Sequence, residues 1–387
     1  MKIMNSRQRL LTVLNCQQSD RVPISTFDLV GYNTKAWENN DPSYKYLMDF
    51  IREKTDCVCI WDPVPQVRFQ TRDFEQPMLG SFMETGSLIA VDIDKYREGN
   101  SEITHITAHT PKGDVKTTYR VMDNVVTSWQ TEHWCKNLDD VDKALSIPYE
   151  PIKYDFSDYA RIKEEVGDKG IIMSMIPDPL CLTAELMEFG EFTIWAMTET
   201  DHFARTVAIL HERFLQNLKN MLDVQLVDLY WICGPEYATP PYLPPRFFRQ
   251  FVVPYVKDIT QLIHSRGSKV RIHIHGKIKR VLDMILETGV DAIDPCESPP
   301  DGDVPLDEIK NQIGDQICIF GNLQPKVLEH ASVDEVERTV IECMQAAKAG
   351  GGYVIMPTSM PIHTPLDKKT EGNYIRFIET ALEYGNY

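Results

Sequence analysis

The stretch Lys269-Val270-Arg271-Ile272-His273-Ile274-His275-Gly276 alternates polar and apolar side chains, which is typical of a β-strand that ends at a glycine. Successive side chains of a strand point to opposite faces, so His273 and His275 are expected to share one face. The residues that follow are amphipathic and predict a helix. A strand that leads into a helix is the repeating unit of a parallel sheet, and this unit indicates an α/β fold.

The same alternation of strand and helix continues through the chain after residue 150. Strands are predicted at residues 170–176, 227–233, 269–275, 291–294, 316–321 and 352–356, and two earlier strands at residues 22–27 and 57–61. Helices are predicted between them, notably at residues 245–265, 277–287, 333–348 and 368–384. Parallel strands need such crossovers, and eight of them can close into a barrel. An open doubly wound sheet is the alternative, but no GxGxxG motif follows the first strand to support dinucleotide binding.

Residues from about 80 to 130 interrupt this alternation. Short β-branched runs at residues 89–92, 103–109 and 115–119, with a turn signal at residues 111–114, predict a small antiparallel insertion. Two short helices are predicted near the N-terminus, at residues 6–14 and 42–54. We therefore expect a single domain over residues 1–387, a (β/α)8 TIM barrel with N-terminal helices and a small antiparallel β insertion.

Composition places the chain among soluble globular proteins, with 387 residues, 43% hydrophobic and 25% charged. The net charge of −17 is spread along the chain, which argues against nucleic acid and anionic membrane as partners. No apolar run approaches the ~18 residues that a membrane span needs, and the N-terminus lacks a signal-peptide pattern. The nine cysteines are scattered, without CxxC spacing, so we expect a cytoplasmic location.

Ionisable or polar residues follow nearly every predicted strand. Active-site groups of a TIM barrel lie at the C-terminal ends of its strands, and strands buried on both faces would not otherwise end so consistently in such groups. A single aspartate in this position is more often the N-cap of the next helix, and Asp178 before Pro179 fits that role. The strand-end residues are Asp28, Asp62, Asp178, Glu236, His273, His275, Cys296, Glu297, Asn322 and Ser359.

The two histidines can hold a transition metal, most readily zinc. Catalytic zinc sites usually have three protein ligands and one open position. We expect Glu297 as the third ligand, and Glu236 and Cys296 stay open as alternatives. The competing interpretation is that the histidines form a hydrogen-bonded pair in a pocket, with Glu236 capping a loop and Cys296 filling apolar space.

Four further residues receive roles in this scheme. Asp62 and Glu236 are the candidate catalytic carboxylates, because each follows a predicted strand and Glu236 follows the strand before the two histidines. Tyr237 lies in a proline-rich loop over the strand ends, and Asn322 ends a strand; both are candidate cofactor-binding residues.

Five segments stand in a characteristic order and spacing along nearly the whole chain. They are Asp20-Arg21-Val22-Pro23, Pro245-Arg246-Phe247-Phe248-Arg249-Gln250-Phe251-Val252-Val253-Pro254-Tyr255, Gly289-Val290-Asp291-Ala292-Ile293, Phe320-Gly321-Asn322-Leu323-Gln324-Pro325 and Gly351-Gly352-Tyr353-Val354-Ile355. In this order and spacing they resemble the uroporphyrinogen decarboxylase superfamily. The resemblance implies a (β/α)8 barrel and a cytoplasmic enzyme.

Two branches of that superfamily differ in their motifs. The decarboxylases of heme synthesis have an arginine-rich motif after the first strand that binds the substrate carboxylates, whereas residues 27–33 here contain no arginine. The cobamide-dependent methyltransferases bind zinc through His-x-Cys and a distant Cys. Only His273 matches that pattern, because His275 and Ser359 stand where the thiolates would be. Histidine and carboxylate ligands suit activation of an oxygen better than of a soft thiol.

The resemblance thus implies a zinc-dependent methyltransferase. It would move a methyl group between a small methylated substrate, a methoxylated aromatic or a methylamine, and a corrinoid carried by a partner protein. The alternative is a metal-independent decarboxylase or lyase that acts on a non-porphyrin acid, with the histidines and Asp62 transferring protons. A third, non-enzymatic alternative is a corrinoid- or tetrapyrrole-binding partner protein.

Overall fold

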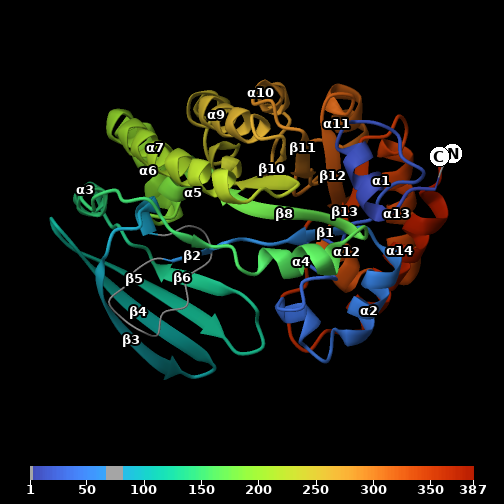
Figure 1. Ribbon diagram of the computed structural model, residues 1–387, viewed down its shortest axis with the longest axis horizontal. Helices are drawn as coiled ribbons and strands as arrows, with labels where there is room; N and C mark the ends of the chain where they lie inside the picture. Colours follow the sequence, from blue (N-terminus) through green and yellow to red (C-terminus); the bar gives the residue numbers. More distant parts are fainter. Residues whose placement is uncertain (1–2, 67–81) are drawn as a thin grey trace.

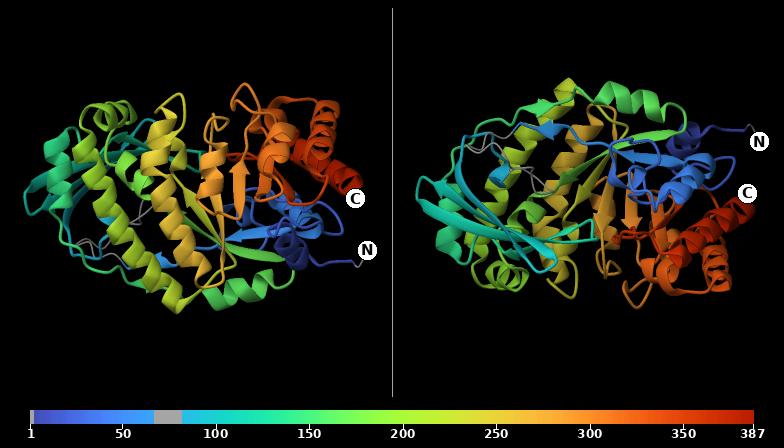
Figure 2. Two further views of the ribbon diagram at one scale, coloured as in Figure 1. Left: turned by 90° about the horizontal axis from the view of Figure 1, so that it is seen from above. Right: turned by 90° about the horizontal axis from the view of Figure 1, so that it is seen from below.

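A curled parallel sheet of seven strands forms the centre of the computed structural model, which describes residues 3–66 and 82–387 (Figure 2). Neighbouring strands are joined by parallel ladders throughout. In spatial order they are β1 (Cys57–Ile60), β8 (Gly170–Pro177), β9 (Leu229–Cys233), β10 (Lys269–Ile274), β11 (Ala292–Pro295), β12 (Cys318–Leu323) and β13 (Tyr353–Pro357).

The eighth position of the barrel is occupied by the segment that we call the closing segment, residues 22–26. Ile24 forms a parallel bridge with Ile355 of β13, and the Ser25 amide donates to the Ile355 carbonyl at 3.0 Å. On its other side, the Asp56 amide donates to the Ile24 carbonyl at 2.8 Å. The predicted strand is reduced to these contacts because Pro23 has no N–H to donate. The fold is therefore TIM-barrel-like, as the sequence predicts.

Helix α1 (Ser6–Val13) closes the N-terminal end of the barrel. Its Leu10 and Val13, followed by Leu14, are buried with the inward side chains of the strands in a core that is separate from the outer one. The Arg7 amide donates to the Asp168 carbonyl at 3.1 Å, just before β8 begins. The opposite end, where the strands finish, is left as the mouth of the barrel.

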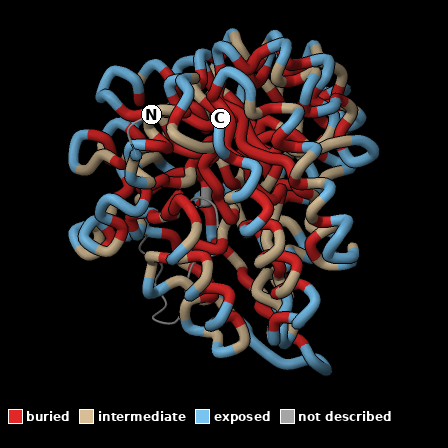
Figure 3. The backbone as a smooth tube through the Cα atoms, turned by 90° about the vertical axis from the view of Figure 1, so that its right-hand side faces the viewer, coloured by how far each residue is buried: buried red, intermediate tan, exposed pale blue. Residues whose placement is uncertain are grey.

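The other helices pack mainly around the sheet and bury its outward side chains, so that buried backbone lies at the centre and exposed backbone outside (Figures 1 and 3). The α-helices are α2 (Lys45–Lys54), α3 (Leu138–Leu145), α4 (Tyr159–Val166), α5 (Pro179–Ala184), α6 (Phe189–Thr198), α7 (Thr200–Val224), α8 (Pro245–Phe251), α9 (Val253–His264), α10 (Leu282–Glu287), α11 (Leu306–Ile313), α12 (Pro325–His330), α13 (Val333–Ala347) and α14 (Lys368–Tyr384). Short 3-10 helices are η1 (Trp37–Asn39), η2 (Phe82–Glu84) and η3 (Pro235–Ala238).

Two predicted helices differ from the structure. The single helix predicted over residues 245–265 is two helices, α8 and α9, because Pro254 in the first turn of α9 cannot continue the hydrogen bonding of a helix from α8. The helix predicted over residues 277–287 forms only from Leu282, as α10.

The predicted insertion is a four-stranded antiparallel sheet, which lies at the opposite end of the molecule from the two termini (Figure 1). The three predicted runs are longer than expected, and a fourth strand was not predicted. The strands are β3 (Ala90–Glu98), β4 (Ser101–Thr110), β5 (Gly113–Met122) and β6 (Ser128–Glu132).

The insertion is attached at the mouth of the barrel. It leaves after β1 through β2 (Val64–Pro65), which pairs with β7 (Tyr154–Asp155). The Val126 amide, between β5 and β6, donates to the Ile362 carbonyl at 3.0 Å, beyond the end of β13. The insertion therefore contacts the loops at the strand ends, where the candidate site lies.

All nine cysteines are free. Within residues 3–66 and 82–387, no helix has both the length and the apolar character that a bilayer crossing demands.

Candidate active site

The side chains of β10 alternate between two environments, as the period of a strand requires. Val270, Ile272 and Ile274 pack in the outer core. His273 and His275 point to the other face, with their ring centroids 4.5 Å apart and their planes perpendicular. The prediction that the two histidines share a face is confirmed.

Asp294 holds the first histidine from the neighbouring strand. It lies opposite His273 in the register of β10 and β11, and its Oδ2 accepts a hydrogen bond from His273 Nδ1 at 2.8 Å. Its Oδ1 accepts from Trp231 Nε1 at 2.8 Å and lies 2.9 Å from Arg271 Nε. Burial raises the pKa of Asp294, but the charge of Arg271 and the contacts with His273 and Trp231 outweigh it, so the pKa lies below its ordinary value.

Arg271 is itself buried beneath the histidines. Its guanidinium lies over the rings of Trp231 and Phe320, 4.6 and 4.9 Å from their centroids. The aromatic rings and Asp294 thus enclose this charge, and Arg271 forms the floor of the site.

Glu297 holds the second histidine in a similar way. Its Oε1 lies 3.2 Å from His275 Nδ1, and its Oε2 accepts from the Gly276 amide at 2.7 Å. Burial lowers the pKa of His275, but the carboxylate of Glu297 reverses this effect, and the net shift is upward. Both oxygens of Glu297 are therefore engaged in orienting the loop and the ring.

The two carboxylates determine which nitrogens remain free. A carboxylate only accepts hydrogen bonds, so each imidazole carries its proton on Nδ1. The Nε2 atoms of His273 and His275 have no hydrogen-bond partner among the residues that the structure describes. Metal-binding histidines commonly have this arrangement, in which one nitrogen is held by a carboxylate and the other is available to the metal.

The predicted set of three metal ligands is not assembled. In the described part of the chain, no three His, Cys, Asp or Glu side chains are grouped so that they could hold a metal ion. Glu297 is turned to His275 Nδ1, and Cys296 is fully buried in the outer core, where burial raises the pKa of its thiol. Cys296 therefore fills apolar space, which was the competing interpretation.

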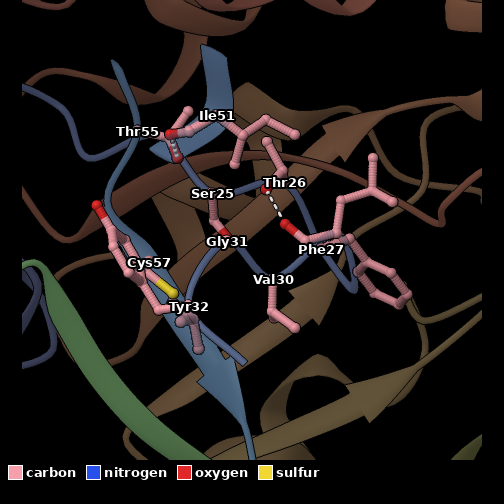
Figure 4. A pocket seen from close by; sticks show the side chains of 11 residues that line it. Ser25, Thr26, Phe27, Val30, Gly31, Tyr32, Ile51, Thr55 and Cys57 are labelled. Carbon is pink, nitrogen blue, oxygen red and sulfur yellow. Dashed lines mark hydrogen bonds between the residues drawn. The ribbon is translucent and has the colours of Figure 1, made fainter. Parts of the chain in front are cut away.

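A turn after the closing segment forms one wall of the mouth. Thr26 Oγ1 donates to the Leu29 carbonyl at 2.8 Å, beside a cavity of about 10 Å³ (Figure 4). Phe27, in the left-handed region with φ 57°, places its ring 6.2 Å from that of His273 and 5.6 Å from that of Trp231.

Asp28 follows on this turn, and the sequence did not assign it a role beyond its place at a strand end. Burial raises the pKa of its carboxyl to about 6, although Arg271 and His273 oppose the shift. This carboxyl has no hydrogen-bond or ion-pair partner in the described ranges. Its position at a strand end was the only signal in the sequence that could have identified it.

Asp62, a predicted catalytic residue, lies beyond the end of β1. Its Oδ1 accepts from Ser174 Oγ at 2.8 Å and from the Met175 amide at 2.7 Å, both on β8. Asp62 keeps contact with solvent, but the surrounding barrel wall removes enough water to raise its pKa to about 6. Its charge also raises the pKa of Asp28.

A cavity of about 430 Å³ opens beside Asp62. Neither histidine is among the described residues that line this cavity. The residues that line the cavity include Asn33, Lys35, Trp61, Asp62, Asp155 and Asp158.

The remaining predicted residues are engaged with the protein. Glu236 accepts from the Gly234 amide at 3.1 Å and so caps its own loop, while its charge raises the pKa of His275. Tyr237 packs against Phe189, and the centroids of the two rings are 5.7 Å apart. Asn322 donates to the Cys296 carbonyl and to Ser298 Oγ, both at 2.8 Å, and accepts from the Cys343 thiol.

Asp178 behaves as the sequence predicts. Its Oδ1 accepts from the Cys181 amide at 2.7 Å and caps the N-terminus of α5. It is therefore a structural residue of the β8–α5 connection.

Comparison with known proteins gives matches of two kinds. Residues 122–371 match the family described as uroporphyrinogen decarboxylase. The uroporphyrinogen decarboxylase of Colwellia psychrerythraea is 21% identical over 245 residues, which are 62% of this chain and 67% of that protein. That of Hydrogenovibrio crunogenus is 27% identical over 139 residues, 35% of this chain and 37% of that protein.

A solved structure resembles the whole chain. It is described as a methyltransferase from Methanosarcina mazei and superposes with a TM-score of 0.61 at 16% sequence identity, with 99% of each chain covered. At that identity the likeness shows a shared fold.

Proposed function

The chain belongs to the uroporphyrinogen decarboxylase family, and from this premise we propose that it is a zinc-dependent methyltransferase. It would transfer a methyl group between a small methylated substrate and a corrinoid that a partner protein carries. The methyltransferase from Methanosarcina mazei, which has the same fold over its full length, supports this branch of the family.

The observation that carries the proposal is the pair of carboxylate-held imidazoles at the mouth of the barrel. Asp294 and Glu297 fix the Nδ1 protons of His273 and His275, and both Nε2 atoms are left to act as ligands. No third His, Cys, Asp or Glu among the described residues is grouped with this pair, so Glu236, whose charge acts on His275, would have to leave its loop contact to become a third ligand. Zinc bound there would act as a Lewis acid on the heteroatom that carries the methyl group.

We favour a substrate other than a porphyrinogen. A porphyrinogen carries several carboxylates, which need arginine partners. Arg271 is buried and engaged with Asp294, and residues 27–33 supply no other arginine. Asp62, held by β8 and with a pKa of about 6, can exchange a proton with the heteroatom that leaves or arrives.

Zinc content is the direct test. Protein purified without chelator should contain about one zinc per chain, and the His273→Ala His275→Ala double variant should contain less than ~0.2. The variant should also lose methyl transfer to free cob(I)alamin by about a hundredfold or more, since the ligands would be gone. The absorbance of the corrinoid reports this reaction.

His330→Ala is the matched control, because His330 is an exposed histidine at the end of α12 whose ring lies against Glu329. This variant should keep both zinc and activity. Equal zinc in the wild type and the double variant would overturn the metal proposal.

A second candidate function is metal-independent decarboxylation of a non-porphyrin acid. Asp62 favours it, because a carboxyl with a pKa of about 6 at the mouth can donate a proton to a carbanion. This candidate predicts CO₂ release that survives exhaustive chelation and falls by about 10²-fold or more in Asp62→Asn. Loss of activity on chelation, with recovery on addition of zinc, would exclude it.

A further inference from the structure

Three neighbouring strands contribute to the surroundings of the second histidine. His275 follows β10, Glu297 follows β11 and Asn322 lies near the end of β12, and these strands lie side by side (Figure 1). The carboxylate of Glu297, in a half-buried loop, contacts His275 Nδ1 and the Gly276 amide. The contacts that hold Glu297 in this position therefore decide how the ring of His275 is oriented.

Asn322 holds the loop on both sides of Glu297. Its Nδ2 donates to the Cys296 carbonyl and to Ser298 Oγ, each at 2.8 Å. Its Oδ1 accepts from the Cys343 thiol of α13 at 3.4 Å. A carbonyl oxygen can only accept a hydrogen bond, so the amide nitrogen must be the atom that faces Cys296. The side chain of Asn322 is thus buried with both ends of its amide engaged.

The backbone of this loop depends on such support. Cys296 has φ 57°, in the left-handed region, where a residue with a Cβ is strained. A strained conformation persists only when the surrounding contacts determine it. The hydrogen bond from Asn322 to the Cys296 carbonyl is one such contact. Gly302 allows another, because a Cβ at that position would overlap the Glu297 carbonyl oxygen and prevent the loop from closing on itself.

We infer that Asn322 is a positioning residue of the site, which fixes residues 296–298 so that Glu297 keeps the His275 proton on Nδ1 and leaves Nε2 free. The inference rests on the proposed function for the use of that Nε2 as a metal ligand. The sequence predicts that Asn322 binds a cofactor, whereas its contacts give it this indirect role.

The tautomer of His275 is the direct test. Nitrogen NMR of isotope-labelled histidine distinguishes a ring protonated on Nδ1 from one protonated on Nε2, and His275→Gln identifies the signal. The spectra are recorded with chelator near pH 9, above the ~6.5 at which imidazole ordinarily titrates. Wild-type His275 should show the Nδ1–H form. Asn322→Ala should release Glu297 from the ring, and the signal of the Nε2–H form should appear.

Two further variants separate positioning from stability. Asn373→Ala is the matched control, because Asn373 is equally buried on α14 and its Nδ2 donates to two carbonyls at the end of α12. This variant should lose stability and keep the tautomer of His275. Ser298→Ala removes only one of the two acceptors of Asn322, so it should give a weaker Nε2–H signal than Asn322→Ala.

A role that acts through Glu297 also predicts non-additive effects. In Glu297→Ala, His275 should already show the Nε2–H form, and adding Asn322→Ala should not increase it. Additive effects would overturn the route through Glu297. An unchanged tautomer in Asn322→Ala, or in Ser298→Ala if the former does not fold, would overturn the role of Asn322.

The inference and the proposed function can fail separately, because the tautomer is measured without metal. With zinc added, Asn322→Ala should bind the metal about tenfold more weakly than the wild type, and Asn373→Ala should bind it equally. An unchanged tautomer in a variant that binds zinc normally and transfers methyl groups would overturn the positioning role and leave the methyltransferase standing. A changed tautomer in a protein whose wild type binds no zinc would do the reverse.

Discussion

Asp294 is buried without exposure to solvent, yet its pKa lies below its ordinary value. The cause is the number of partners that converge on one carboxylate, namely Arg271, His273 and Trp231. A buried charge is stable only when paired and hydrogen-bonded, and removing one partner is strongly destabilising. This arrangement fixes the position and tautomer of His273, which the proposed chemistry requires.

Glu84 is a second buried carboxyl, and its pKa is raised where that of Asp294 is lowered. Its side chain is almost fully buried, its Oε2 accepts from Asn217 Nδ2 at 3.0 Å, and burial raises its pKa from 4.5 to about 7. A pKa that is higher in the folded state stabilises the fold below pH 4.5, and this stability is lost as pH rises through 7. Between those pH values the free energy of unfolding should fall by about 3 kcal/mol because of Glu84.

We therefore predict that Glu84→Gln, which mimics the neutral acid, removes this part of the pH dependence. Urea unfolding at pH 4.5 and pH 8 should show that the wild type loses about 3 kcal/mol more than the variant. Glu379→Gln, at an exposed position, should keep the pH dependence of the wild type. Identical pH dependence in Glu84→Gln and the wild type would contradict the prediction.

At the scale of the elements, the sequence predicts what depends on local periodicity. The alternation in β10 predicts that His273 and His275 share a face, and the strand–helix alternation predicts the barrel. Residue type and position also predict the cap at Asp178, because Pro179 follows it. The break between α8 and α9 was predictable from Pro254, although amphipathic periodicity on both sides concealed it.

Contacts between elements were not predictable in the same way. Asp294 contacts His273 because β10 and β11 pair in one particular register, and no feature of either strand alone specifies it. Glu297 reaches His275 Nδ1 and the Gly276 amide through a loop in which Cys296 has φ 57°. The sequence therefore predicts that Glu297 lies near His275. It predicts a metal ligand, however, whereas in the structure Glu297 orients the ring of His275 and the loop.

At the scale of the whole molecule, closure of the barrel depends on a short segment with few hydrogen bonds of its own. Asp56 secures it from the start of β1: its Oδ2 accepts from the Ile24 amide at 2.9 Å and from Arg21 at 2.8 Å. Its Oδ1 accepts from Arg9 of α1 at 2.6 Å. The buried carboxylate of Asp56 thus joins helix α1, the closing segment and the start of β1.

We predict that Asp56→Asn opens this closure, because both arginines lose a charged partner in a buried position. The free energy of unfolding should fall by about 3 kcal/mol. Hydrogen exchange should accelerate at the Ser25 and Ile355 amides, which bond across the closure, and stay unchanged within the β4–β5 hairpin. Asp123→Asn, which removes an exposed pair with Arg97, should cost less than ~1 kcal/mol and leave those amides protected. Unaltered exchange at Ser25 and Ile355 in Asp56→Asn would show that the closing segment is held by packing alone.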